Sequence, residues 1–211
     1  MTQPAPAVAD GPPSRLGRKR DHSRDADILQ AAIEILAEEG FDGMTIEMVA
    51  TRAKAGKATL YRRWPGKEEL VLEAIGCMKS TELDLGSLPD TGTLRGDLVA
   101  MIKPRTTEES ERKLRVMAGV AALLTRAPEL TDAASAALMG PRMAAHRILL
   151  ERARARGEVR ADADLDALSR LLPAMASFRL LVERKPIDRD FQISLIDGIL
   201  LPAAGVARST P

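Results

Sequence analysis

The sequence predicts an all-α protein, and three observations support this fold class. Ala, Leu, Met, Arg and Glu are plentiful, whereas aromatic residues make up 2% of the 211 residues, a composition that favours helix over strand. Apolar residues recur at helical spacing, and Gly or Pro divides the periodic segments. Beyond the loop at residues 86–92, the chain has no turn chemistry suited to β-hairpins. The content of 45% hydrophobic and 29% charged residues allows a packed core, in one large domain or two small ones.

Residues 1–22 are predicted to form a disordered basic arm. Pro, Ala and Gly dominate residues 1–14 without an apolar period, and four of the next six residues are Lys or Arg. Such an arm is either a plain flexible tail or a segment that contacts the phosphates of a nucleic acid. The composition does not choose between the two.

Residues 23–68 are predicted to form a unit of three helices. The first helix runs from Ser23 to Gly40, because apolar residues recur in it at helical spacing with acidic residues between them. Gly40 is suited to a left-handed cap, and Phe41 just beyond it can fold back onto the apolar face of the helix.

The second and third helices are expected to be short. Thr45 begins the second, because its hydroxyl can accept hydrogen bonds from the backbone N–H groups of the first turn. The apolar pattern breaks at residues 53–56, and the third helix ends before Pro65, whose ring disfavours helical geometry at Trp64. Trp64 is expected to pack the third helix against the first and fourth. Two short helices joined by a tight turn form a helix-turn-helix.

Residues 69–211 are predicted to form a larger helical domain. A fourth helix begins near Lys67 and ends near the glycine-containing loop at residues 86–92. Pro141 and Pro173 fall inside later helices, where each removes a backbone donor and should kink its helix. The remaining helices are expected at residues 93–103, 107–126, 128–156, 164–184 and 188–203.

Positive charge is concentrated in one short segment of the chain. The formal net charge is only +1, so any affinity for nucleic acid must arise locally. From Arg52 to Lys67, sixteen residues include six Lys or Arg and no Asp or Glu. A basic run can be no more than a solvated surface. This one, however, spans the predicted helix-turn-helix.

The stretch from Ile28 to Ile75 resembles the DNA-binding domain of the TetR (tetracycline repressor) family of transcriptional regulators. It reads ILQAAIEILAEEGFDGMTIEMVATRAKAGKATLYRRWPGKEELVLEAI, with the family's elements in order. Two positions depart from the family pattern. The turn at residues 53–56 reads Ala-Lys-Ala-Gly where Ala-Gly-Val-Ser is common, and Gly66 stands where a capping residue often begins the fourth helix.

This resemblance implies an N-terminal three-helix helix-turn-helix DNA-binding domain followed by a C-terminal helical ligand-binding and dimerisation domain. It also implies a DNA-binding transcriptional regulator, by default a repressor that a small-molecule effector releases from a palindromic operator. Repression is the default because occluding a promoter requires only binding. The resemblance covers about 50 of 211 residues and does not identify the effector.

Residues of the recognition helix should lie against base edges in the major groove of double-stranded operator DNA. By position, Gly56, Lys57 and Ala58 begin that helix. Lys57 can donate to guanine O6 and N7, and Ala58 can touch a thymine methyl. Arg62, one turn beyond, can reach a base or a phosphate. The resemblance implies phosphate contacts for Thr45, Thr59, Tyr61 and Lys67.

A single helix-turn-helix reads few bases, so a homodimer on a two-fold site is expected. The helices predicted at 164–184 and 188–203 carry broad apolar stripes suited to that interface. The alternative is that both stripes serve only the core of one subunit. The residues predicted for the interface are Leu168, Leu172, Met175, Phe178, Ile196 and Leu200.

Methionines gather in the predicted ligand-binding domain, where flexible thioethers suit a pocket for apolar ligands but also fill ordinary cores. Surface exposure is expected for His146 and Arg142. If they face inward instead, they favour a ligand with an acceptor or a negative charge. The candidate ligand-binding residues are Met101, Met117, Met139, Met143, His146 and Met175.

An enzyme built on a helical bundle and an architectural DNA binder without a ligand are the alternatives. Against an enzyme, the chain has no nucleophile in a recognisable setting, no Glu-x-x-His spacing and no glycine-rich phosphate loop. One Cys and two His do not form a zinc site without heavy help from carboxylates, so neither a metal nor a cofactor is expected. A reducing cytoplasm is expected, because Cys77 lacks an internal disulfide partner. The longest apolar run, Val116–Leu124, is far shorter than the roughly 18 residues of a membrane span.

Overall fold

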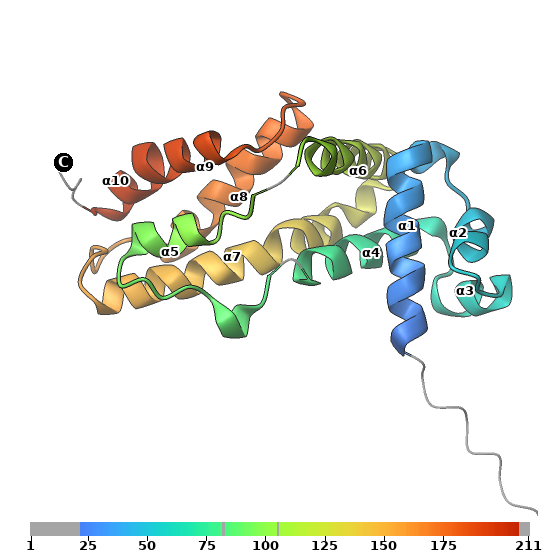
Figure 1. Ribbon diagram of the computed structural model, residues 1–211, viewed down its shortest axis with the longest axis horizontal. Helices are drawn as coiled ribbons and strands as arrows, with labels where there is room; N and C mark the ends of the chain where they lie inside the picture. The colour runs from blue at the N-terminus through green and yellow to red at the C-terminus, as the bar shows by residue number, and fades with distance from the viewer. Residues whose placement is uncertain (1–21, 82, 105, 207–211) are drawn as a thin grey trace, which may run out of the picture.

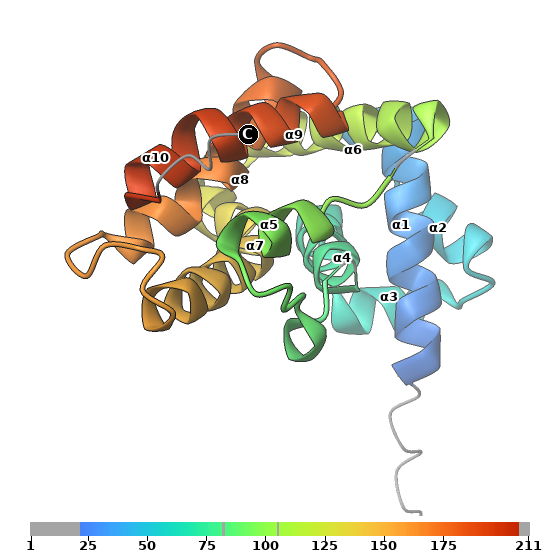
Figure 2. The ribbon, with the colours of Figure 1, turned by 60° about the vertical axis from the view of Figure 1, so that its left-hand side comes forward.

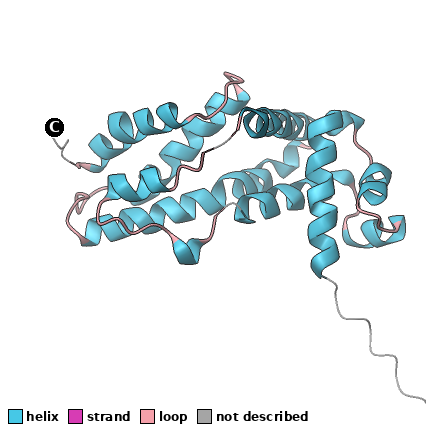
Figure 3. Cartoon of the chain, viewed as in Figure 1, coloured by secondary structure: helices cyan, strands magenta, loops and turns pink. Residues whose placement is uncertain are grey.

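The computed structural model describes residues 22–81, 83–104 and 106–206, and every regular element within these ranges is helical (Figure 1, Figure 3). The predicted all-α class is therefore confirmed. The basic arm expected at residues 1–22 lies outside the described residues except for His22, which begins the first helix.

An N-terminal unit is built from four helices, of which α1 is the longest. Figure 1 shows α2 and α3 together on one side of α1, at one end of the molecule, with the C-terminal helices at the other end. The predicted boundaries of the two short helices are confirmed. The four helices are α1 (His22–Gly43), α2 (Ile46–Arg52), α3 (Lys57–Arg63) and α4 (Lys67–Thr81).

The rest of the chain forms a bundle whose long helices are α6, α7 and α8. The helix expected at 188–203 is continuous but contains a π-helical turn, η3. Pro141 and Pro173 lie inside α7 and α8, as predicted. The elements are η1 (Leu85–Ser87), α5 (Leu94–Ala100), α6 (Thr107–Arg126), η2 (Pro128–Leu130), α7 (Thr131–Ala155), α8 (Leu165–Leu181), α9 (Arg189–Leu195), η3 (Ile196–Leu200) and α10 (Leu201–Ala204).

Local chemistry sets the ends of the first helices. Gly40 has a φ of 69°, so the backbone leaves helical geometry there and directs Phe41 into the core, where 2% of its surface is exposed. The hydroxyl of Thr45 accepts a hydrogen bond from the N–H of Met48 at 3.2 Å and caps α2. In the turn before α3, Lys54 adopts a φ of 49°, a region that favours glycine.

Buried apolar side chains form two clusters. One contains residues of α1, α2, α3 and α4 and is completed by residues of α6, including Val116, Val120 and Leu123. The other joins α5, α7, α8 and the terminal helix. Because α6 contributes to the first cluster, the N-terminal unit shares its core with the larger part of the chain.

Helices α6 and α1 cross closely. Figure 2 shows α6 meeting the C-terminal half of α1. At this crossing a Cβ atom built onto Gly119 would lie 2.5 Å from Cδ1 of Leu36, so any larger residue requires the Leu36 side chain or one of the helices to shift. The two helices are therefore in close contact at this position.

Candidate functional site

The start of α3 is exposed on the surface of the N-terminal unit. Leu60 is fully buried and anchors the helix against the core. Lys57, Ala58 and Arg62 are exposed, and Tyr61 has 47% of its surface exposed despite its aromatic ring. Small residues at positions 56 and 58 allow another molecule to approach the α3 backbone.

Glu47 of α2 lies beside this exposed face. One of its carboxylate oxygens is 3.5 Å from Nζ of Lys57 and accepts a hydrogen bond from the hydroxyl of Tyr61 at 3.3 Å. Its own backbone hydrogen bond, followed by the charge of Lys57, lowers the pKa of Glu47 below its ordinary value. An ionised carboxylate thus borders the basic surface, and the basic run gave no sign of it because Glu47 precedes that run.

Three of the six bases between Arg52 and Lys67, namely Arg52, Arg63 and Lys67, contact residues of α1. Arg52 donates to both carboxylate oxygens of Glu38, at 2.9 and 2.7 Å. Arg63 forms an ion pair with Asp25 near the start of α1. Arg62 and Lys54 are exposed. The surface charge available to a ligand of α3 is therefore smaller than the run suggests.

Lys67 differs from the expectation of a phosphate contact. Its ammonium donates to the carbonyls of Phe41 and Met44, at 2.8 and 3.4 Å, and lies 4.5 Å from the centre of the Phe41 ring. The turn at Gly40 leaves carbonyls at the end of α1 in need of donors, and Lys67 supplies them. In this structure Lys67 holds α4 to the end of α1.

Two other predicted residues also have roles inside the unit. Thr45 is exposed and caps α2, and Thr59 is half-buried in α3. Trp64 is 3% exposed and its Nε1 donates to Glu73 of α4 at 2.7 Å, which confirms the expected packing role.

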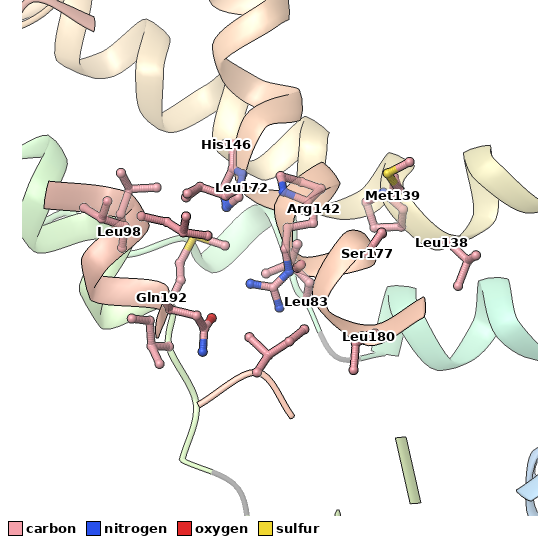
Figure 4. A pocket seen from close by; sticks show the side chains of 18 of the residues that line it. Leu83, Leu98, Leu138, Met139, Arg142, His146, Leu172, Ser177, Leu180 and Gln192 are labelled. Atoms are coloured by element: carbon pink, nitrogen blue, oxygen red, sulfur yellow. The ribbon is translucent and has the colours of Figure 1, made fainter. Parts of the chain in front are cut away.

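The larger part of the chain contains a cavity of about 90 Å³, shown in Figure 4. Residues of α6, α7, α8 and the terminal helix line it, together with Leu98 of α5 and Leu83 after α4. Four of the six candidate ligand-binding residues are in its wall, namely Met101, Met117, Met139 and His146.

Met143 and Met175 are outside the lining. On α7 the lining residues are Leu138, Met139, Pro141, Arg142 and His146, and Met143 lies beyond the edge of the helical face that they define. On α8 the lining residues Ala176 and Ser177 follow Met175 directly. Methionine content alone does not tell which face of a helix meets a cavity.

The surface exposure expected for His146 and Arg142 is wrong. His146 is 3% exposed, and both residues line the cavity. Burial, and then the charge of Arg142, lowers the pKa of His146 to about 4, while a contact with the carbonyl of Ser169 opposes this shift. His146 is therefore a neutral imidazole near pH 7.

An ion pair to a buried carboxylate, which the sequence analysis did not anticipate, lies on the α5 side of the cavity. Asp97 is fully buried and accepts hydrogen bonds from the N–H and hydroxyl of Thr91, at 2.6 and 2.8 Å. Arg156, just after α7, lies 3.2 Å from the same carboxylate. These contacts hold Leu98, the next residue of α5, in the cavity wall.

The predicted interface residues separate into two groups. Leu168, Ile196 and Leu200 have 7%, 2% and 0% of their surface exposed and pack into the subunit's own core, so they are wrong as interface residues. The apolar stripes of the two terminal helices extend over more than one helical face, and the part that faces inward is covered by other helices of the same subunit. Phe178 is 49% exposed and remains a candidate for the interface, and Val182 and Ile199 are also exposed, at 65% and 43%. Leu172 lines the cavity, and Met175 is half-buried.

Two family models match the chain. One, described as "Tetracyclin repressor-like, C-terminal domain", matches residues 88–199, and the other, "Bacterial regulatory proteins, tetR family", matches residues 28–74. The first alone covers more than half of the 211 residues.

The chain belongs to the TetR family.

Relatives of this TetR-family protein extend over nearly its whole length. An uncharacterized HTH-type transcriptional regulator of Mycobacterium tuberculosis is 34% identical over 188 residues, which cover 89% of this chain and 90% of that protein. The DNA-binding transcriptional repressor TetR of Mycobacteroides abscessus is 30% identical, over 86% of this chain and 94% of that protein. The crystal structure of the TetR family transcription regulator SCO0332 is 29% identical, with a TM-score of 0.59, and the match covers 84% and 97% of the two chains.

Membership confirms the resemblance seen in the sequence and makes the protein a DNA-binding transcriptional regulator rather than an enzyme. The exposed start of α3 lies within the segment that matches the tetR family model. In the part of the regulator that the structure describes, no helix is both long and apolar enough to cross a bilayer.

Proposed function

We propose that this regulator is a repressor that binds a palindromic operator as a homodimer and leaves it when a small molecule fills the cavity. The Mycobacteroides abscessus relative carries the name of a repressor, which supports the direction of control. In this proposal residues 23–68 contact DNA, and residues 69–211 bind the effector and form the dimer.

The proposed DNA contacts follow exposure and charge at α3. Lys57 and Ala58 meet base edges, while Arg62 and Tyr61 meet a base or the backbone. In this proposal the N–H groups at the start of α3 and the exposed Thr45 at the start of α2 contact phosphate. Lys67 positions α4 and stabilises the unit instead of contacting DNA, because its ammonium is already bound to two carbonyls.

The proposed dimer interface is the outer face of α8 and η3. Phe178, Val182 and Ile199 are large apolar side chains left exposed on these elements, and a second subunit would cover them. A two-fold dimer would place two recognition helices on half-sites about 34 Å apart.

The close crossing of α6 and α1 is the observation that carries effector control. Lys113 and Met117 of α6 line the cavity, and Gly119 lies two residues further on, against Leu36 of α1. A ligand that displaces α6 must therefore move α1, which carries α2 and α3. A shift of a few ångströms would break contacts on at least one half-site.

Helix α7 makes a second connection of the same kind. Its residues Leu138 and Met139 line the cavity. The neighbouring Ala137 faces Gly76 of α4, where a Cβ added to the glycine would be 3.7 Å away. Cavity and DNA-binding unit are thus linked through two helices.

The test begins with an operator selected from random double-stranded DNA by its affinity for the protein. Fluorescence anisotropy then measures binding to that operator, with and without fractions of a bacterial metabolite extract. We expect a palindromic consensus and at least one fraction that weakens binding by about 5- to 150-fold, the usual size of allosteric coupling. Affinity unchanged by every fraction would contradict effector control, and a consensus without two-fold symmetry would contradict the dimer.

Calorimetry supplies the control for this mechanism. The active compound should bind more weakly, by the same factor, when the protein is saturated with operator, because the coupling between two binding sites is reciprocal. Equal affinities for the compound with and without operator would show that its binding to the protein is not coupled to DNA binding.

A further inference from the structure

The cavity wall is apolar except for a few side chains, which are either positively charged or neutral and polar. Its charged members are Lys113 of α6 and Arg142 of α7. Gln192 of α9 and Ser177 of α8 add neutral polar groups, and His146 is neutral near pH 7. No Asp or Glu is among the lining residues that the structure describes. The wall therefore carries net positive charge.

The polar groups converge within the cavity. Figure 4 shows the guanidinium of Arg142 and the amide of Gln192 extending into the same space from opposite walls, with His146 and Leu172 beyond them. Ser177 and Met139 lie on the other side of Arg142 in the same view. Both cations also interact with other groups of the protein, so a ligand would join an existing polar cluster.

We propose that the effector is a carboxylate with an apolar body, and that Arg142 binds its carboxylate. The planar fork of an arginine matches the two oxygens of a carboxylate, and such charge-assisted pairs are about twice as strong as neutral hydrogen bonds. Lys113 adds a second positive charge, while the methionine and leucine side chains of the wall enclose the apolar body. A cationic ligand would be repelled by both groups. This inference rests on the proposed function, because it names the ligand class of the same effector site.

The size of the cavity limits how the ligand enters. At about 90 Å³ it is smaller than the cavity of about 150 Å³ that admits benzene in another protein. A ligand with more than a few non-hydrogen atoms therefore either extends through the open side of the cavity or displaces side chains of its wall. Met101, Met117 and Met139 are suited to this, because an unbranched thioether changes rotamer at little cost. A displaced Met117 would press on α6 next to its contact with α1.

Matched pairs of compounds test the ligand class on the full-length protein. Calorimetry compares propionate, hexanoate, decanoate and benzoate with their primary amides, which have nearly the same shape and no charge. We expect at least one carboxylate to bind about 10-fold or more tightly than its amide, the effect of a hydrogen bond to a charged partner. The proposal is overturned if no carboxylate exceeds its amide, whether both bind or neither does.

Three variants test the role of Arg142 with the carboxylate that binds best. Arg142→Gln should remove the preference for the carboxylate, and Arg142→Lys should keep part of it, because an ammonium retains the charge but lacks the fork. Arg154→Gln is the matched control, since Arg154 lies on the exposed side of the same helix. Circular dichroism verifies that each variant is folded. An unchanged preference in folded Arg142→Gln would overturn the assignment of Arg142, as would a loss of preference in the control.

His146 provides a readout that does not depend on affinity. The chain has two histidines, so His22→Gln assigns the imidazole NMR signals. A carboxylate bound at Arg142 should raise the pKa of His146 from about 4, because it offsets the nearby positive charge. A saturating amide, which brings no charge, should leave the pKa lower than the carboxylate does. Equal pKa values in both complexes would overturn the proposed position of the carboxylate.

The selected operator separates this inference from the proposed function. If a carboxylate binds as predicted but leaves operator affinity unchanged, the ligand class stands and effector control fails. If instead a neutral or cationic metabolite releases the operator while every carboxylate fails to exceed its amide, effector control stands and the carboxylate is wrong.

Discussion

The basic residues of the helix-turn-helix differ in what their charges do. Arg52 lies against Glu38 and Arg63 against Asp25, so both charges are compensated within the protomer. Arg62 is exposed on α3 without being drawn into such a pair among the described residues. The charge that matters to DNA is therefore set by contacts rather than by the number of bases in the run.

Arg62→Gln should lower the salt dependence of operator binding. Each phosphate contact contributes about 0.9 to the slope of log affinity against log salt, so losing one contact in each subunit of a dimer should reduce the slope by about 1.8. Anisotropy between about 50 and 200 mM salt measures it. Arg52→Gln is the matched control and should leave the slope nearly unchanged. A larger change in the control than in Arg62→Gln would contradict the assignment.

Lys54 occupies a backbone conformation that costs a non-glycine residue free energy. Its φ of 49° lies in the left-handed region, where a Cβ crowds the backbone. Lys54→Gly should therefore be more stable to urea than Lys54→Ala, by up to about 1 kcal/mol. The comparison with alanine cancels the loss of the lysine charge. Equal midpoints and slopes of unfolding would mean that the turn relaxes around this residue.

At the scale of the helices, two close contacts determine how neighbouring elements are held together. Gly119 lets α6 approach α1, and Lys67 holds α4 to the corner after α1. The first contact joins a helix that lines the cavity to the unit that carries α3, and the second lies within that unit. Rigid crossings of this kind pass on a displacement of α6 because a packed core offers little room to absorb it.

Gly119→Ala should destabilise the protein and disturb the position of α1. The new methyl would meet the side chain of Leu36, and overpacking of this kind costs roughly 1 to 3 kcal/mol. Urea unfolding measures the loss, which should be smaller when the same substitution is made in a Leu36→Ala background, because the clashing side chain is then absent. Gly140→Ala is the control, because no atom lies within 4 Å of the added Cβ and alanine favours helix. A stabilised Gly119→Ala would contradict the close crossing.

At the scale of the whole molecule, the same two terminal helices cover the subunit core and leave an apolar face outside. Phe178, Val182 and Ile199 are on the outer face, and Ile196 is on the inner one. Substitutions on the two faces should therefore have different consequences.

Val182→Glu combined with Phe178→Glu should produce a folded monomer, because the charges would be buried only when two subunits meet. Ile196→Glu should instead unfold the subunit, since it places an unpaired charge in the core. Sedimentation gives the oligomeric state, and circular dichroism with thermal unfolding reports the fold. An intact dimer of the double variant would reject this face as the interface.

Local sequence was enough for the helical class and the helix-turn-helix. The apolar period, the cap at Thr45, the turn at Gly40 and the stop before Pro65 act within a few residues, so they can be read in order along the chain. The TetR-like motif added the function for the same reason, since its residues are nearly contiguous.

Only the tertiary structure decided which of these residues remain available to a ligand. Lys67 meets carbonyls more than twenty positions earlier, and Arg52 meets a carboxylate fourteen positions earlier. His146 is buried because α8 covers it. Leu200 is buried because it packs into the cluster formed with α5, α7 and α8. Pairing and burial depend on segments that are distant in sequence and adjacent in space, so periodicity alone could not place these side chains.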